Sequence, residues 1–157
     1  NLEFFGGAYG LHGSKFRERI EWALDSFSLR NFSTMSTAKL PLGYKRRLSM
    51  ACALLHEPDI LFLDEATSGA DPMARREFWA RIISLADSGV TVIITTHFLD
   101  EAEYCDRMVI MMDGIIPAAG TPDEIRKLGV TAENKNPTLE DAFVNVIKDF
   151  RKPEPEK

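Results

Sequence analysis

The feature that most constrains this fold is a short apolar run, residues 60–63, that leads directly into Asp64 and Glu65. Continuous rather than alternating hydrophobicity is typical of a strand buried on both faces, and therefore of a parallel sheet. A second apolar run over residues 90–95 leads into Thr96 and His97. Ligands bind at the carboxyl ends of the strands in open α/β sheets, so we expect a site where these two runs end.

Helical signals surround the two runs and indicate an α/β architecture. Asp71 and Pro72 form a cap and first turn, and Gly89 ends the helix they begin. Asp113-Gly114 is a two-residue hairpin signal between strands predicted over residues 107–112 and 115–119. Other helices are predicted over residues 14–27 with Ser14 as the cap, from Pro41 to His56, over residues 98–105, from a capping box at Thr121, and from Thr138. Residues 1–13 and 28–39 are predicted to be connections, and residues 153–157 a fraying tail.

Composition limits the classes of protein that remain. The chain has 157 residues, of which 45% are hydrophobic and 27% charged, which suits one ordinary folded domain and excludes general disorder. The net charge of −5 gives no basic surplus for nucleic acid. No apolar run is long enough to cross a bilayer, and Cys52 and Cys105 lie in apolar stretches that suit free thiols. A soluble cytosolic domain, or a piece of something larger, is indicated.

The carboxylates at residues 64 and 65 suit a hydrolytic reaction. One carboxylate can hold Mg²⁺, and the next can orient and deprotonate an attacking water. Two acids in a solvated turn are the alternative. His97 is open to two interpretations as well, a phosphate donor or an ordinary polar residue. His97, Glu101 and Cys105 recur at every fourth position, but no fourth ligand accompanies them, which disfavours a metal site.

The residues after Glu65 favour the hydrolytic interpretation. Residues 66–72 read Ala-Thr-Ser-Gly-Ala-Asp-Pro, and the strand that ends at His97 follows. This order resembles the nucleotide-binding domain of ATP-binding-cassette (ABC) proteins, with a Walker B strand, a D-loop and a switch histidine. The resemblance implies that Asp64 supports Mg²⁺, that Glu65 is the catalytic base and that His97 contacts the γ-phosphate of ATP. It also implies that Ser68 and Asp71 lie at a dimer interface, where Asp71 keeps its capping role. Ala66 and Ala70 depart from the family's usual Pro and Leu.

Residues 40–48 occupy the place of the family's signature, usually Leu-Ser-Gly-Gly-Gln. Only Leu40 and Gly43 match it, and Pro41 removes both a hydroxyl and an N–H group. The resemblance then implies that the N–H groups of Leu42, Gly43 and Tyr44 serve the ATP of the opposite subunit, since an anion binds well at a helix N-terminus. Together with residues 98–107 and 138–143, this form is similar to exporter ATPases of drug efflux systems and to a related ribosome-associated ATPase.

The phosphate-binding loop of the family, Gly-x-x-x-x-Gly-Lys-[Ser/Thr], has no counterpart here, because the sequence contains no Gly-Lys pair. Residues 1–5 resemble the stretch just after the family's Q-loop. We therefore expect an incomplete ABC domain with a partial P-loop NTPase core of the RecA-like type: a helical subdomain over residues 1–58, the second half of the core over residues 59–128, and a C-terminal helix and tail over residues 129–157.

The resemblance implies an ATP-binding and hydrolysing subunit of a transporter that works as an exporter and needs ATP and Mg²⁺. Its expected partners are a second ABC domain in a head-to-tail dimer and a membrane permease, with no nucleic acid, at the cytoplasmic face of the cell membrane. Two alternatives stay open. The altered signature favours a degenerate, non-hydrolysing partner domain, and the subgroup includes a soluble ATPase that acts on ribosomes.

Overall fold

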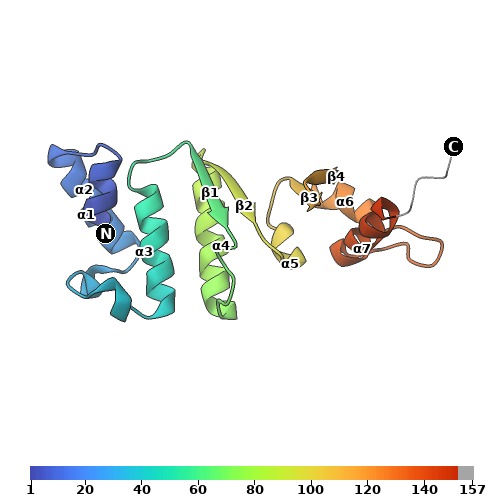
Figure 1. The fold of residues 1–157 in the computed structure, drawn as a ribbon, viewed down its shortest axis with the longest axis horizontal. Helices are drawn as coiled ribbons and strands as arrows, with labels where there is room; N and C mark the ends of the chain where they lie inside the picture. Colours follow the sequence, from blue (N-terminus) through green and yellow to red (C-terminus); the bar gives the residue numbers. More distant parts are fainter. Residues whose placement is uncertain (152–157) are drawn as a thin grey trace. The chain divides into compact units, whose positions relative to one another are not determined.

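The structure is a computed structural model that describes residues 1–151 and divides into two compact units, with the division after Thr95. Figure 1 shows the order of the elements, and the units are described separately below. The tail predicted over residues 153–157 lies outside the described residues. Within residues 1–151, no helix combines the length and the apolar character that crossing a membrane requires.

The first unit begins with helices. They are α1 (Leu2–Ala8), α2 (Gly13–Ser26), the short 3-10 turns η1 (Arg30–Phe32) and η2 (Thr37–Lys39), and α3 (Leu42–Leu54). The prediction of a connection over residues 1–13 was wrong, because α1 packs on α2 and α3. Gly6 permits this approach: a Cβ there would lie 2.8 Å from the ring of Phe16. The helix predicted from Ser14 starts at Gly13, and His12 precedes it without a side-chain cap.

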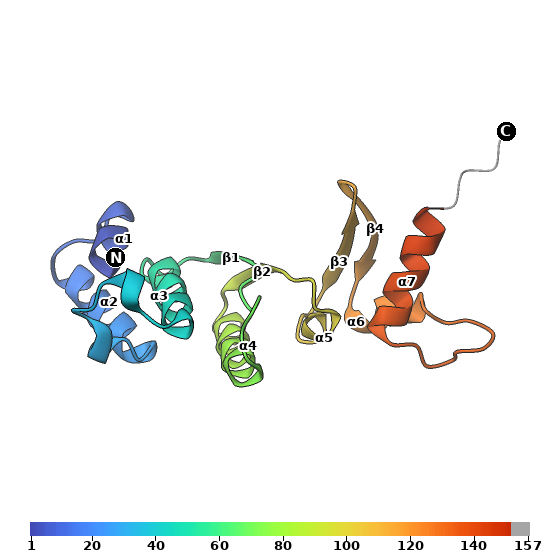
Figure 2. The ribbon, with the colours of Figure 1, turned by 60° about the horizontal axis from the view of Figure 1, so that its bottom comes forward.

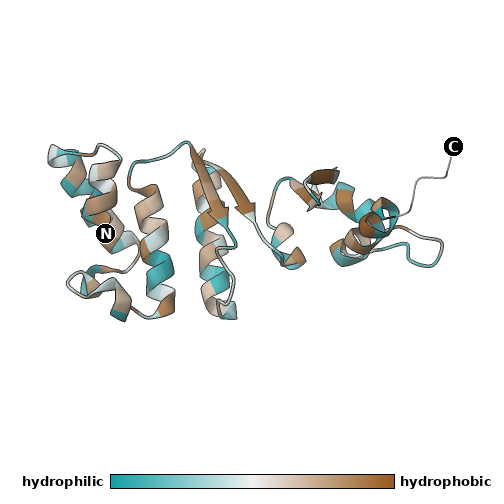
Figure 3. Ribbon diagram, in the orientation of Figure 1, coloured by the Kyte–Doolittle hydropathy of each residue, from teal (hydrophilic) through white to brown (hydrophobic). Residues whose placement is uncertain are grey.

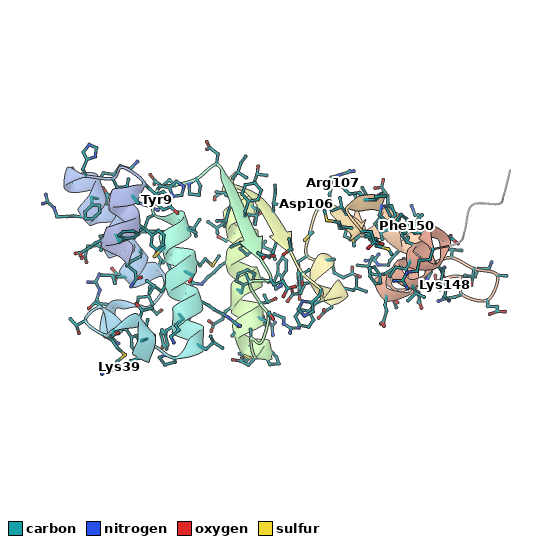
Figure 4. The ribbon with its side chains drawn as sticks, viewed as in Figure 1. Tyr9, Lys39, Asp106, Arg107, Lys148 and Phe150 are labelled. Carbon is teal, nitrogen blue, oxygen red and sulfur yellow. The ribbon has the colours of Figure 1, made fainter. Side chains whose placement is uncertain are left out.

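Contacts near the end of α3 tie the helices of this unit together. The guanidinium group of Arg19 on α2 donates to the carbonyls of Leu54 and Leu55, each at 3.0 Å. Tyr9, which follows α1, is labelled in Figure 4. Its ring lies against that of His56, with centroids 4.0 Å apart. The hydrogen bonds from Arg19 satisfy carbonyl groups that the end of a helix leaves without intrahelical donors.

A βαβ unit completes the first unit, as the apolar runs predicted. The strands β1 (Ile60–Asp64) and β2 (Thr91–Thr95) pair in parallel, and α4 (Pro72–Asp87) connects them. The side chain of Asp71 caps α4 by accepting a hydrogen bond from the N–H of Ala74 at 2.9 Å, which confirms its predicted capping role. After α4, Gly89 has a φ of +99°, a left-handed conformation that glycine adopts without steric cost.

The sheet of the first unit is covered on one face. Leu61 is 4% exposed, and α4 packs against β2 on that side (Figure 2). The other face carries Ile60, Phe62 and Ile93, which are 52%, 71% and 48% exposed. Figure 3 shows both strands as hydrophobic. Burial on both faces was predicted, and within residues 1–95 only one face is buried, because this unit by itself supplies no second layer.

We expect the 157 residues, purified by themselves, to self-associate through this open face, because exposed apolar sheet surface favours association. Sedimentation velocity across a wide concentration range would show a rising mean sedimentation coefficient. Phe62→Asp would suppress the rise, whereas Val109→Asp, an exposed change in the second unit, would not. A wild-type chain that stays monomeric throughout would contradict the prediction.

Within residues 96–151, the second unit contains a hairpin and three helices. Its elements are α5 (Leu99–Ala102), β3 (Met108–Met112), β4 (Ile115–Gly120), α6 (Pro122–Lys127) and α7 (Leu139–Phe150). The antiparallel hairpin turns at Asp113 and Gly114, whose φ values of +48° and +78° confirm the predicted two-residue turn. The helix predicted over residues 98–105 is shorter than expected. The core of the second unit consists of Ala102, Ile110, Ile125, Leu139 and Ala142.

Capping boxes begin both α6 and α7; the one at Thr121 was predicted, whereas at Thr138 only the start of a helix was predicted. Thr121 and Glu124 exchange side-chain and backbone hydrogen bonds at α6, and Thr138 and Asp141 do so at α7. The hydrogen bond from the backbone N–H of Thr121 lowers the pKa of Glu124 from its ordinary value of 4.5. The N–H of Thr138 likewise lowers the pKa of Asp141 from its ordinary value of 3.8.

These shifts predict an acid-sensitive second unit. A carboxyl whose pKa is lower in the folded state stabilises the fold above its unfolded pKa, and this stabilisation is lost as pH falls through the folded pKa. We expect the thermal midpoint to fall as pH drops below the ordinary Glu value of 4.5. The double variant Glu124→Gln and Asp141→Asn would show a shallower decline in circular dichroism melts. If the thermal midpoints of the wild type and the double variant fell equally with pH, Glu124 and Asp141 would not be the source of the acid sensitivity.

Candidate functional site

The two adjacent carboxylates lie where β1 ends, as the sequence predicted. The register pairs Asp64 with Thr95, the last residue of β2. The hydroxyl of Thr95 donates to Oδ1 of Asp64 and accepts from the N–H of Glu65 at 3.1 Å. The carbonyl of Thr95 also accepts from that N–H at 3.1 Å. Thr95 therefore fixes both the carboxylate of Asp64 and the backbone of Glu65.

Glu65 occupies an uncommon backbone conformation. Its φ is +43°, in the left-handed region that residues other than glycine seldom adopt. Strained conformations of this kind persist only where the surrounding structure holds them, and they cluster at functional sites. Here the N–H of Glu65 is held by Thr95, and its carbonyl accepts from the N–H of Ser68 at 2.9 Å. Asp64 and Glu65 are both exposed, so water reaches both residues.

A tight turn, residues 65–71, connects β1 to α4. The N–H of Ala70 donates to the carbonyl of Thr67 at 2.9 Å, and Thr67 is buried. Gly69 has a φ of +66°, which reverses the chain within this turn. The guanidinium group of Arg46, on α3, donates to the carbonyl of Ser68. The first turns of α3 are therefore linked to the turn that follows Glu65.

The beginning of α3 presents part of the predicted anion site. Leu42 and Gly43 are its first residues, so their N–H groups have no carbonyl one turn earlier within the helix. The N–H of Tyr44 donates to the carbonyl of Pro41 at 3.0 Å, so this group is already engaged. The side chain of Leu42 is 60% exposed.

Several predicted site residues line the same hollow of the first unit. Its volume is about 850 Å³, and its lining includes Leu42, Gly43, Tyr44, Asp64 and Asp71. Glu65 and Ser68 adjoin this lining in sequence without belonging to it. The structure thus brings most of the predicted residues of the first unit to one concave surface.

His97 belongs to the second unit. Its side chain is exposed, and its ring lies against that of Phe98 with centroids 4.1 Å apart. A hydrogen bond connects the two neighbours of His97, because the hydroxyl of Thr96 accepts from the N–H of Phe98 at 3.0 Å. The imidazole is thus presented on a locally ordered stretch of chain.

The donor set suits a divalent cation that keeps other ligands. Within residues 1–151, no three His, Cys, Asp or Glu side chains gather to form a metal cage. The carboxylate of Asp64 is a hard oxygen ligand, and Mg²⁺ is usually held by one or two carboxylates together with water and substrate phosphates. Asp64 therefore fits Mg²⁺ that arrives with a phosphate ligand. The cysteines do not contribute, since burial raises the pKa of the Cys52 and Cys105 thiols and keeps them protonated.

Thr95 and Arg46 are functional candidates that the sequence analysis did not identify. The signal for Thr95 was present, because it ends the second apolar run just as Asp64 ends the first. Their pairing depends on strand register, which hydrophobic patterning alone leaves open. Arg46 gave no signal of its own, because it lies within a basic run, residues 45–47, and its contact is with a distant backbone carbonyl.

Thr95→Val is expected to weaken the site while preserving the strand, because valine keeps the branched shape and loses the hydroxyl. Hydrogen bonds to charged groups contribute about 1.5–3 kcal/mol, so we expect an approximately tenfold or greater loss of kcat/KM for the reaction of the complete protein. Thr95→Ser should retain most of the activity. Equal activity of the Val and Ser variants would show that the hydroxyl has no role.

Comparison with known proteins identifies the class to which this fold and site belong. Residues 3–68 match the family model described as "ABC transporter". The chain is 51% identical over 152 residues to the probable multidrug ABC transporter ATP-binding protein YbhF of Escherichia coli strain K12, covering 97% of this chain and 26% of that protein. The chain therefore belongs to the ABC transporter ATP-binding family, which confirms the resemblance inferred from its motifs.

Other relatives are named for export or resistance. The Nod factor export ATP-binding protein I of Sinorhizobium fredii is 42% identical over 123 residues, which cover 78% of this chain and 36% of that protein. The daunorubicin resistance ATP-binding protein DrrA3 of Streptomyces coeruleorubidus is 39% identical over 127 residues, which cover 80% of this chain and 40% of that protein. The chain thus spans between 26% and 40% of the length of these relatives.

Solved structures share the fold. An ATP-binding subunit of an ABC transporter aligns with a TM-score of 0.78 and 30% identity over 93% of this chain and 60% of that chain. The cbiO1 protein of Clostridium perfringens, part of the ABC transporter complex cbiONQ, aligns with a TM-score of 0.68 and 30% identity. The alignment covers 85% of this chain and 57% of that chain. These alignments confirm the predicted class, an ABC ATPase of the P-loop NTPase type with a mixed α/β fold.

Proposed function

We propose that this chain is the second part of an ATP-hydrolysing domain that drives export through a membrane permease. The observation that carries the proposal is the arrangement at the end of β1, where Thr95 holds the carboxylate of Asp64 and the backbone of Glu65 together. Adjacent carboxylates at the end of a parallel strand suit a cation-assisted attack by water on a phosphate.

Asp64 and Glu65 take different roles in this proposal. Asp64 is held by the Thr95 hydroxyl, which orients its carboxylate as a ligand for Mg²⁺. Bound Mg²⁺ would neutralise charge on the phosphates of ATP. Glu65 is exposed and sits on a backbone fixed by two acceptors of β2, so its carboxylate is placed to orient a water molecule and accept its proton.

The start of α3 and the turn before α4 provide the contacts to a second ABC domain. The free N–H groups at Leu42 and Gly43, with Tyr44 beside them, suit the γ-phosphate of ATP held by the opposite subunit of a head-to-tail dimer. Ser68 and Asp71 would lie at that dimer interface. Arg46 links the two segments through the Ser68 carbonyl, so that they would move together when the dimer closes.

His97 completes the proposed machinery as a donor to the γ-phosphate. A neutral imidazole donates from one ring nitrogen while the other accepts, and it can stabilise charge on a transferring phosphoryl group. His97 is exposed at the beginning of the second unit, on chain that Thr96 holds in place.

The domain would act with a permease at the cytoplasmic face of the membrane, without nucleic acid. The names of the relatives, multidrug, Nod factor export and daunorubicin resistance, support export as the direction of transport. The net charge of −5 is in keeping with protein partners rather than nucleic acid. Within the complete domain, residues 1–58 would form the helical subdomain, 59–128 the second half of the core, and 129–157 the C-terminal helix and tail.

A degenerate partner domain is the second candidate, and the beginning of α3 favours it. Pro41 supplies neither hydroxyl nor N–H, and the N–H of Tyr44 is engaged with Pro41. Such a domain would complete another subunit's ATP site without hydrolysing ATP itself. The ordered Asp64, Glu65 and Thr95 arrangement favours hydrolysis instead.

Hydrolysis by the complete protein decides between these functions. The experiment measures phosphate release from Mg-ATP, alone and with the permease reconstituted in vesicles. Release that the permease stimulates supports the proposal. An inactive protein that still stimulates a second ABC domain supports the degenerate partner, and hydrolysis stimulated by ribosomes but not by the permease supports the soluble ATPase.

A further inference from the structure

We propose that Glu101 is a positioning residue for His97 and acts through the hydroxyl of Thr96. The inference rests on the proposed role of His97 in ATP hydrolysis, and it concerns a buried carboxylate that this mechanism does not otherwise use. Glu101 lies on α5. Its carboxylate accepts a hydrogen bond from Thr96, the residue that directly precedes His97.

Glu101 is almost fully buried, although glutamate is rarely buried unless it is paired. The residue is 1% exposed, and the next residue, Ala102, belongs to the apolar core of the second unit. The hydroxyl of Thr96 donates to Oε2 of Glu101 at 2.6 Å. This distance lies within the range of well-formed O–H···O hydrogen bonds.

The direction of this bond determines what Thr96 can do for its neighbours. A threonine hydroxyl has a single hydrogen, and Glu101 accepts it, so the lone pairs of the oxygen remain for other donors. The N–H of Phe98 donates to that oxygen at 3.0 Å. Glu101 thereby fixes the rotamer of Thr96, and Thr96 fixes the backbone on the far side of His97.

The same chain of contacts determines the orientation of the imidazole. The hydroxyl of Thr96, before His97, bonds to the N–H of Phe98, after it. The ring centroid of His97 lies 4.1 Å from that of Phe98. The backbone of α5 adds a further restraint, since the N–H of Glu101 donates to the carbonyl of Phe98 at 3.1 Å. Loss of the Thr96 hydroxyl would free the Phe98 N–H and widen the range of imidazole positions.

This arrangement predicts an effect on turnover rather than on nucleotide affinity. His97 would contact only the terminal phosphate, so a mobile imidazole lowers the population of the reactive geometry and leaves the other contacts to ATP unchanged. In the complete protein, Thr96→Val should lower kcat on the order of tenfold with KM nearly unchanged, since both hydrogen bonds of the hydroxyl are lost. Thr96→Ser, which keeps the hydroxyl, should retain most of kcat.

A double-mutant cycle separates positioning from general structural damage. If Glu101 and Thr96 act through His97, then Thr96→Val added to His97→Ala should cause no further loss of kcat. Glu101→Gln, which keeps an acceptor oxygen, should be milder than Glu101→Ala and should likewise lose its effect in the His97→Ala background. Thr91→Val, the same change at an exposed position of β2, serves as the matched control.

Hydrogen exchange provides a readout that does not depend on activity. The amide of Phe98 should exchange faster in Thr96→Val than in Thr96→Ser, even if Glu101→Ala fails to fold. Independent, multiplicative losses in the double variant, or unchanged Phe98 exchange, would overturn the inference. If His97→Ala alone leaves kcat unchanged while Phe98 exchange still responds to Thr96→Val, the proposed role of His97 fails and the local contact alone stands.

Discussion

Glu65→Gln is expected to lower kcat for ATP hydrolysis by the complete protein by on the order of 10² or more, because general-base catalysis contributes about that factor. The amide cannot accept the proton of the attacking water. It keeps the size of the side chain, and the N–H of Glu65 still bonds to Thr95, so the fold and the Asp64 carboxylate should be unchanged. ATP affinity should be preserved, and the ATP-bound dimer should persist longer, because hydrolysis normally opens it.

The measurement is steady-state phosphate release together with nucleotide affinity and size-exclusion chromatography in Mg-ATP. Glu21→Gln is the matched control, since it makes the same change at an exposed ion pair with Arg30 on the helical side of the first unit. Such surface pairs contribute little, so this variant should behave as wild type. A Glu65→Gln protein with the normal rate would move the assignment to the degenerate partner.

Features that depend on a few neighbouring residues were predictable from the sequence. The caps at Asp71, Thr121 and Thr138 follow from side chains that reach N–H groups within one turn. The Asp113-Gly114 turn follows from the residues that tolerate positive φ. The parallel pairing of the two apolar runs was also predictable, because their length and continuity suit a βαβ unit.

Features that depend on distant residues were not predictable. The helix α1 carries two adjacent glycines, which disfavour a helix, and it forms because Leu2 and Gly6 are buried against other helices. The links from Arg46 to Ser68 and from Thr96 to Glu101 require the positions of whole elements before the contacts are evident. The roles of Glu65, His97 and the amides of α3 came from the family resemblance, and they remain predictions.

The 157 residues by themselves are expected to show no measurable ATPase activity and to bind Mg-ATP more weakly than roughly 1 mM. Tight triphosphate binding needs several N–H donors and a lysine around the phosphates, and this sequence contains no Gly-Lys pair for such a loop.

The groups that the chain does offer to a nucleotide favour the same result. The N–H groups at Leu42 and Gly43 would serve a nucleotide held by another subunit, and the single contact of Asp64 with Mg²⁺ leaves the phosphates of ATP without donors from this chain. Isothermal titration calorimetry with Mg-ATP, beside the complete protein as the positive control, would show heat only for the latter. Micromolar affinity of the isolated residues would mean that they contain a nucleotide site which neither the motifs nor the hollow beside α3 accounts for.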